Sequence, residues 1–170
     1  IDTNSTNRKV SVWYKENHPG GTTVVITAAH TSESGRTSLC GTYSGIATSS
    51  ALDQVSQRSQ NNPGTGTDAV ASLATSAISS SGQLVLTIIW LNEATLTNSA
   101  GTGFTERFNA NDGGSSSSGM WFAEDKTGNA PDTQTGTATT SSATVDVNVH
   151  VSTFKLPAAG GGEQQLVIGS

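Results

Sequence analysis

Hydrophobic and polar residues alternate one by one over residues 144–156 of this chain. Val145, Val147, Val149 and Val151 take every second position, and polar residues such as His150 stand between them. A period of two with β-branched residues on one side predicts a β-strand that turns one face to a core and the other to water.

Shorter segments of similar character predict further strands. They are residues 9–15, 22–27, 39–43, 69–78, 83–91, 104–108 and 120–126. Residues 83–91 are the most apolar and predict a buried central strand. The alanine spacing in residues 69–78 would also suit a helix, but Ser or Thr at nearly every other position favours a strand.

Turn-forming residues separate these segments. Pro19, Gly20 and Gly21 lie between the first two, so we expect residues 9–15 and 22–27 to form an antiparallel hairpin. Residues 46–68 are rich in Ser, Gln and Gly, which predicts a surface crossover with room for one short strand.

This succession of strands, without a helical period of useful length, predicts an all-β fold. The expected architecture is an antiparallel β-sandwich of jelly-roll or immunoglobulin-like type. We expect one domain over residues 1–157, followed by a Gly-rich linker and one more strand in residues 158–170.

The composition indicates where the protein is located. Only 12% of residues are charged, while Ser and Thr make up more than a quarter of the chain. This balance is typical of a sandwich with hydroxyl-covered faces and favours an extracellular location, on a virion or a cell surface. The net charge of −5 without a basic cluster argues against nucleic-acid binding. The apolar run at 84–91 is too short to insert into a membrane.

Residues that could carry chemistry are few. Cys40 is the only cysteine, so it cannot form an internal disulfide. We expect a small buried side chain there, with an intermolecular bridge or a nucleophile as alternatives. His18, His30 and His150 lack the short spacing of a zinc site, and we expect no metal and no cofactor.

The loop at residues 109–114 offers oxygen ligands and glycines for a sharp turn, as a calcium loop does. It has too few carboxylates for a dedicated site, and an ordinary Asx turn is the favoured interpretation.

Glu124 and Asp125 are the strongest candidates for acid–base chemistry. Because they are adjacent in a predicted strand, they should lie on opposite faces and cannot face each other. A glycosidase would need a second carboxylate roughly 5 to 10 Å away, which Glu16, Glu93 or Glu106 would have to supply. No other catalytic motif occurs, so we expect a protein that is not an enzyme, in which Glu124 pairs with a basic side chain or caps a turn.

Three tryptophans are the candidates for glycan binding, because an exposed indole stacks on sugar rings. Trp90 ends the most apolar segment and is expected in the core. Trp13 alternates with Ser11 and Lys15, which predicts an outer face, and Trp121 borders the Ser-rich loop. Trp13 and Trp121 therefore form the possible glycan-binding site.

Several short motifs occur in a recognisable order. They are Val10-Ser-Val-Trp-Tyr-Lys15, Gly21-Thr-Thr-Val-Val-Ile-Thr27, Tyr43-Ser-Gly45, Ala51-Leu-Asp53, Gly101-Thr-Gly-Phe-Thr105, Glu124-Asp-Lys126 and Phe154-Lys155. With this order and spacing, residues 7–157 resemble a β-sandwich module that recurs in phage structural proteins, tail fibres and large bacterial surface proteins. The resemblance implies a non-enzymatic module for display, adhesion or assembly, and it supplies no catalytic residue.

One departure from that module concerns its first strand. Such a module opens with a strand resembling Leu-Val-Ile-Gly, which is missing before residue 9, whereas Gln165, Leu166, Val167 and Ile168 resemble it near the end of the sequence. A sandwich without an edge strand exposes unpaired backbone groups that accept a strand from elsewhere. We therefore expect residues 163–170 to add to a sheet, in their own domain or in a neighbouring subunit. The alternative is an unpaired tail or the start of a following repeat.

Together these patterns predict a structural or adhesive subunit of an extracellular assembly, with copies of itself or other subunits as partners. The alternative is a carbohydrate-binding module with glycans as partners. The two differ in where function resides, at sheet edges in the first and on an aromatic surface in the second.

Overall fold

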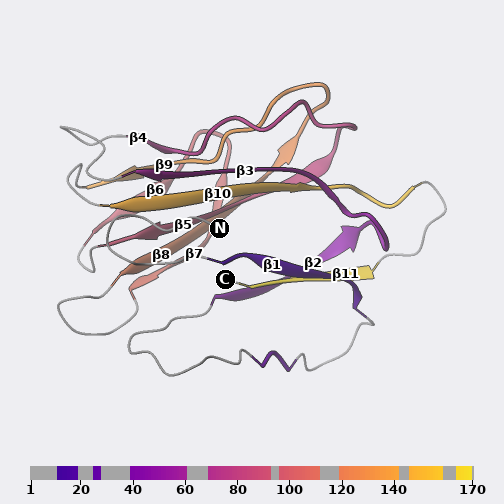
Figure 1. Ribbon diagram of the computed structural model, residues 1–170, viewed down its shortest axis with the longest axis horizontal. Coiled ribbons are helices and arrows are strands. Elements are labelled where there is room, and N and C mark those ends of the chain that lie inside the picture. Colours follow the sequence, from indigo (N-terminus) through magenta and orange to yellow (C-terminus); the bar gives the residue numbers. More distant parts are fainter. Residues whose placement is uncertain are drawn as a thin grey trace.

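The computed structural model describes residues 11–18, 25–27, 39–60, 69–92, 96–111, 119–141, 146–158 and 164–169. The fold is all-β and antiparallel, as predicted (Figure 1). Its strands are β1 (Trp13–His18), β2 (Cys40–Ile46), β3 (Leu52–Gln60), β4 (Ala69–Ala71), β5 (Gln83–Leu91), β6 (Asn98–Ala100), β7 (Thr105–Asn111), β8 (Met120–Gly128), β9 (Thr137–Thr140), β10 (Val147–Phe154) and β11 (Gln164–Gly169).

These strands form a sandwich around a five-stranded central sheet of order β3-β10-β5-β8-β7. A three-stranded sheet of order β1-β11-β2, here the β11 sheet, lies on one side of it (Figure 1). A second three-stranded sheet of order β4-β9-β6, here the β9 sheet, lies on the other side. The central sheet is therefore covered on both faces.

Strand β5 shows the effect of this double covering. Ile88 and Ile89 point to opposite faces, because side chains alternate along a strand, yet both are buried, with exposed fractions of 3% and 0%. Full burial on both faces is the reason why residues 83–91 read as an almost continuous apolar segment.

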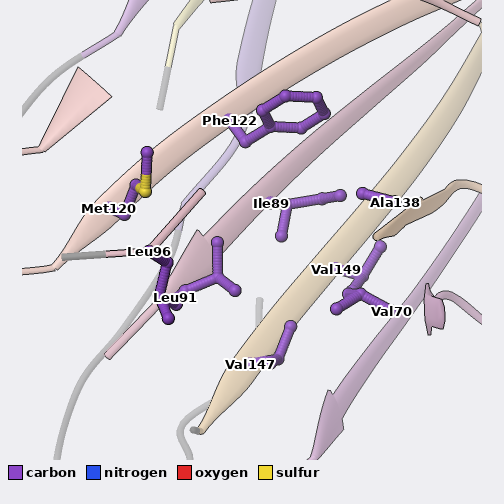
Figure 2. Close-up of a cluster of buried hydrophobic side chains, with 9 residues drawn as sticks. All are labelled: Val70, Ile89, Leu91, Leu96, Met120, Phe122, Ala138, Val147 and Val149. Atoms are coloured by element: carbon purple, nitrogen blue, oxygen red, sulfur yellow. The ribbon is translucent and has the colours of Figure 1, made fainter. Parts of the chain in front are cut away.

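Each face of the central sheet has its own hydrophobic cluster. The cluster toward the β11 sheet comprises Ile46, Ala51, Leu86, Ile88, Trp90, Trp121 and Phe154. The cluster toward the β9 sheet, drawn in Figure 2, comprises Val70, Ile89, Leu91, Leu96, Met120, Phe122, Ala138, Val147 and Val149. A fully buried side chain of this size contributes about 1.5–3 kcal/mol, so the two clusters hold the three layers together.

The predicted strand near residue 150 is present as β10, but the expectation that its polar face meets water is wrong. Asn148 and Ser152 are buried, because the β11 sheet lies on the side of the central sheet that they share with Trp90 and Leu86. Their side-chain oxygens have local partners instead, whereas Asn148 Nδ2 has no hydrogen-bond partner among the described residues. Ser59 donates a hydrogen bond to Asn148 Oδ1, and the Ser152 hydroxyl lies 2.6 Å from His150 Nε2.

Two predictions about pairing in the first third of the chain are also wrong. Residues 46–68 contain the nine-residue strand β3, which pairs with β10 along its length. The predicted hairpin partner at 22–27 does not form a strand at residues 25–27, and its other residues lie outside the described part. Instead, β1 pairs with β11.

The segment predicted as one strand over residues 69–78 is a strand only at β4. Beyond it, the N–H groups of Ser72 and Thr75 donate to the carbonyl groups of Gly136 and Gln134, at 2.9 and 2.8 Å. From one of these hydrogen bonds to the next, the chain after β4 advances by three residues, while the segment before β9 advances by two. The unequal steps leave some backbone N–H groups without a backbone acceptor. The Ser72 and Thr75 hydroxyls accept from the N–H groups of Gly136 and Gln134, at 3.0 and 2.9 Å. The hydroxyl groups thus complete an irregular ladder.

Candidate assembly site

Strand β11 is the middle strand of its sheet and pairs along both edges. Its Val167 is the register partner of Lys15 in β1 and of Thr42 in β2, and both ladders are antiparallel. Strands β1 and β2 therefore run parallel to each other with β11 between them. Neighbouring strands lie about 4.8 Å apart, so the space between β1 and β2 has the width of one strand.

The residues predicted to assemble lie in this strand. Gln165, Leu166 and Val167 have the partners His18, Tyr43 and Thr42 respectively. Ile168 has the partners Tyr14 and Gly41. The expectation that these residues add to a sheet is confirmed, and the pairing occurs within one chain.

Strand β1 is attached to the central sheet through Glu16. Its carboxylate accepts hydrogen bonds from the N–H groups of Ala51 and Ser50, at 2.7 and 3.0 Å. The ring of Tyr14 packs edge-on against Phe154 of β10, with centroids 5.4 Å apart. Glu16, named above as a possible catalytic partner, thus caps the backbone just before β3.

Strand β2 is attached through Tyr43, which hydrogen-bonds the carboxylate of Asp125 in β8. Arg107 holds the same carboxylate with two hydrogen bonds of 2.7 and 2.9 Å. Burial, followed by the negative charge of Asp125, raises the pKa of the Tyr43 hydroxyl, so this group stays protonated and donates. Sequence reasoning missed this cluster, since only the fold brings positions 43, 107 and 125 together.

The outer face of the β11 sheet carries the one predicted glycan-binding residue that is accessible. Trp13 is 38% exposed, and since its neighbour Tyr14 packs inward, it points away from the core. Trp121 is 6% exposed and belongs to the core, so it offers no face for stacking on a sugar.

Cys40 is exposed, and the expectation of a buried cysteine is wrong because β2 turns that residue away from the central sheet.

Glu124 lies on the opposite face from Asp125, as the strand pattern predicts. Its carboxyl is 0% exposed and accepts a 2.8 Å hydrogen bond from the N–H of Gly101. Burial raises its pKa to about 7, against the lowering effects of the Gly101 and Thr137 N–H groups and the Lys126 charge. Gly101 opens a turn that is closed by a 3.0 Å hydrogen bond from the Phe104 N–H to the Gly101 carbonyl, so Glu124 caps a turn, which is one of the two expected alternatives, and it also contacts the backbone of Thr137 in the β9 sheet.

The described neighbours of Glu124 are closely packed. Its register partner Thr87 is 0% exposed and lies so close to Gly136 that a Cβ there would come within 2.5 Å. Glu106 in β7 is the other register partner and is exposed, so two of the candidate carboxylates are adjacent. Only Glu106 is exposed, while the buried Glu124 contacts the backbone at Gly101.

The remaining candidates for metal binding are the histidines and the calcium-like loop. Among the described residues, no group of three His, Cys, Asp or Glu side chains could hold a metal ion. Burial lowers the pKa of His150 to about 4, so this ring is neutral. His30 and the calcium-like loop beyond residue 111 lie outside the described residues. No helix in the described part is long and apolar enough to cross a membrane.

Comparison with protein-family models, with curated proteins and with solved structures gives no match for this chain.

Proposed function

We propose that this protein is a non-enzymatic structural or adhesive subunit of an extracellular assembly, such as a virion fibre or a cell-surface filament, whose copies join by exchanging β11. One observation carries the proposal. The middle strand of the β11 sheet is β11, which follows β10 in the sequence and is separated from it by residues 155–163.

Exchange keeps every backbone hydrogen bond of the sheet. A strand from a second copy offers the same donors and acceptors as the chain's own β11, so the difference between the two states lies in the connecting segment. That segment contains three consecutive glycines at 160–162, and glycine permits more backbone conformations than any other residue. A copy that donates its strand to one neighbour and receives one from another makes a head-to-tail contact, which extends into a filament if it does not close.

Other observations support the setting. The low charge content and abundant hydroxyl groups favour an extracellular protein. The buried carboxyl of Glu124 offers nothing to a substrate, which favours structure over catalysis. The resemblance to phage and bacterial surface modules agrees with this choice.

The test compares the native chain with two linker variants. One lacks residues 159–162, and the other carries four additional Gly and Ser residues at the same place. A shorter linker disfavours return of β11 to its own domain, and a longer one relieves that constraint. Molar mass is measured by light scattering over a range of concentrations, with negative-stain imaging of each sample.

We expect the mass of the native chain to rise with concentration, the shortened chain to form larger particles and the lengthened chain to remain smaller. If all three chains are monomers at every concentration, exchange of β11 between copies is refuted.

Carbohydrate binding is the second candidate, favoured by the exposure of Trp13 on the outer face of the β11 sheet. A glycan array with the native chain tests it, and Trp13→Ala should abolish any signal. Binding that survives this substitution would place the glycan site elsewhere.

A further inference from the structure

The two strands beside β11 have their own attachments to the rest of the molecule. For β1, the carboxylate of Glu16 holds the backbone N–H groups of Ser50 and Ala51, and Tyr14 packs on Phe154. None of these contacts involves residues 164–169. Among the described residues β11 is the only strand that pairs with β1, but these side-chain contacts would still hold β1 if β11 left.

Strand β2 is attached independently of β11 as well. Tyr43 bonds to Asp125, whose side chain is only 7% exposed and is held by Arg107 from β7. The strand ends at Ile46, which is 3% exposed in the core, and the next residue, Ala47, donates a 2.9 Å hydrogen bond to the Lys155 carbonyl. The middle and the C-terminal end of β2 thus have fixed neighbours in the central sheet or next to it.

Departure of β11 from such a frame would uncover two parallel strand edges facing each other. Each edge presents a row of backbone donors and acceptors, and a single extended segment satisfies both rows. A gap whose sides are held in place loses little conformational entropy when a strand enters, and this preorganisation favours binding.

We propose that β1 and β2 form a preorganised slot that remains in place when β11 leaves and that binds residues 164–169 of a second copy, antiparallel to both strands and in the register of the chain's own β11. This inference rests on the proposed function, because it names the receiving site of the exchanged strand. Glu16 and the cluster of Tyr43, Asp125 and Arg107 are its positioning residues.

The experiment uses the full-length chain with residues 159–162 replaced by a protease recognition sequence. After folding, the linker is cut, so that β11 is held by non-covalent contacts alone. A fluorescent peptide with the sequence of residues 163–170 is then added in excess, and its incorporation is followed by fluorescence anisotropy. The matched control is the same peptide carrying Val167→Pro, which removes a backbone donor from the middle of the strand.

We expect one native peptide to enter each cut chain while the fluorescence of the buried Trp90 and Trp121 stays constant, and we expect the proline peptide to be excluded. The preorganised slot would be refuted if the fluorescence of Trp90 and Trp121 were lost when β11 is released. It would also be refuted if both peptides were taken up equally.

Positioning is tested by Tyr43→Phe and Glu16→Gln in the cut chain. Each removes or weakens one attachment of a slot wall, and we expect each to reduce peptide affinity roughly tenfold with an unchanged tryptophan signal. Glu106→Gln, which makes the same acid-to-amide change on an exposed side chain of β7 outside the slot, is the control and should bind as the parent does. Unchanged affinity in both attachment variants would remove their positioning role.

The two proposals can fail separately. If the cut chain takes up the peptide while the uncut chain is strictly monomeric, the preorganised slot is supported and assembly is refuted. Filaments of the uncut chain without peptide uptake would support assembly and refute the preorganised slot.

Discussion

Replacement of Glu124 by Gln should reduce the loss of stability that the protein suffers as the pH rises from 4.5 to 8. The native carboxyl is 0% exposed, and burial raises its pKa to about 7 from an ordinary value of 4.5. A carboxyl with a higher pKa in the folded than in the unfolded state binds more protons when folded. Its favourable contribution is therefore complete below pH 4.5 and is lost as the pH rises to 7. The amide introduced by Glu124→Gln would carry no charge at any of these pH values.

The size of the effect follows from the two pKa values. A difference from 4.5 to about 7 corresponds to about 3 kcal/mol of unfolding free energy. Hence the free energy of unfolding of Glu124→Gln, relative to the native chain, should increase by about 3 kcal/mol between pH 4.5 and pH 8. Any constant cost of the altered hydrogen bond to Gly101 cancels in this comparison between pH values.

The measurement is urea unfolding of both chains at pH 4.5, 6 and 8, followed by tryptophan fluorescence. Glu106→Gln, which removes an exposed carboxylate paired with Glu124 across the same two strands, is the control for loss of one surface charge. A stability difference between Glu124→Gln and the native chain that is the same at all three pH values would refute a raised pKa for Glu124.

Three further substitutions test other parts of the fold. His150→Gln should gain up to about 3 kcal/mol relative to the native chain as the pH falls from 6.5 to 4, because a histidine whose pKa is lowered to about 4 by burial loses stability over that window; parallel pH profiles would contradict this. Gly136→Ala should cost about 1–3 kcal/mol, because the new Cβ would come within 2.5 Å of a buried threonine, whereas Gly41→Ala, with no atom closer than 3.9 Å, serves as its control in thermal unfolding. Thr75→Ala should cost about 1–3 kcal/mol by leaving a buried N–H group without its acceptor, and the exposed neighbour in Ser76→Ala should cost little; equal melting temperatures would contradict the role of the hydroxyl.

The strands with the strongest patterns could be predicted from the sequence. β5, β8 and β10 follow their apolar or alternating segments closely, because burial of β-branched and aromatic residues dominates local structure there. β3 could not be predicted, since its sequence of Leu, Asp, Gln, Val, Ser and Arg residues carries little apolar signal. It forms a strand because β10 supplies its ladder and because a position at one end of the sheet tolerates polar side chains.

The candidate site was predictable only in part. The likeness of residues 165–168 to a missing strand predicts that they join a sheet, but not that β1 and β2 would take them between themselves. Periodicity also places Glu124 and Asp125 on opposite faces, and the structure agrees, with Glu124 contacting Gly101 and Asp125 contacting Tyr43. The identities of such partners depend on how sheets stack, and no local pattern records that.

The antiparallel pairing of β11 with both neighbours has a mechanical consequence. Its hydrogen bonds lie roughly perpendicular to the strand direction, so tension applied along β11 shears the two ladders instead of opening them one bond at a time. All bonds of both ladders then share the force from the start. A strand seated in this way resists pulling much better than one held along a single edge, and an assembly joined through it would carry tension along its length.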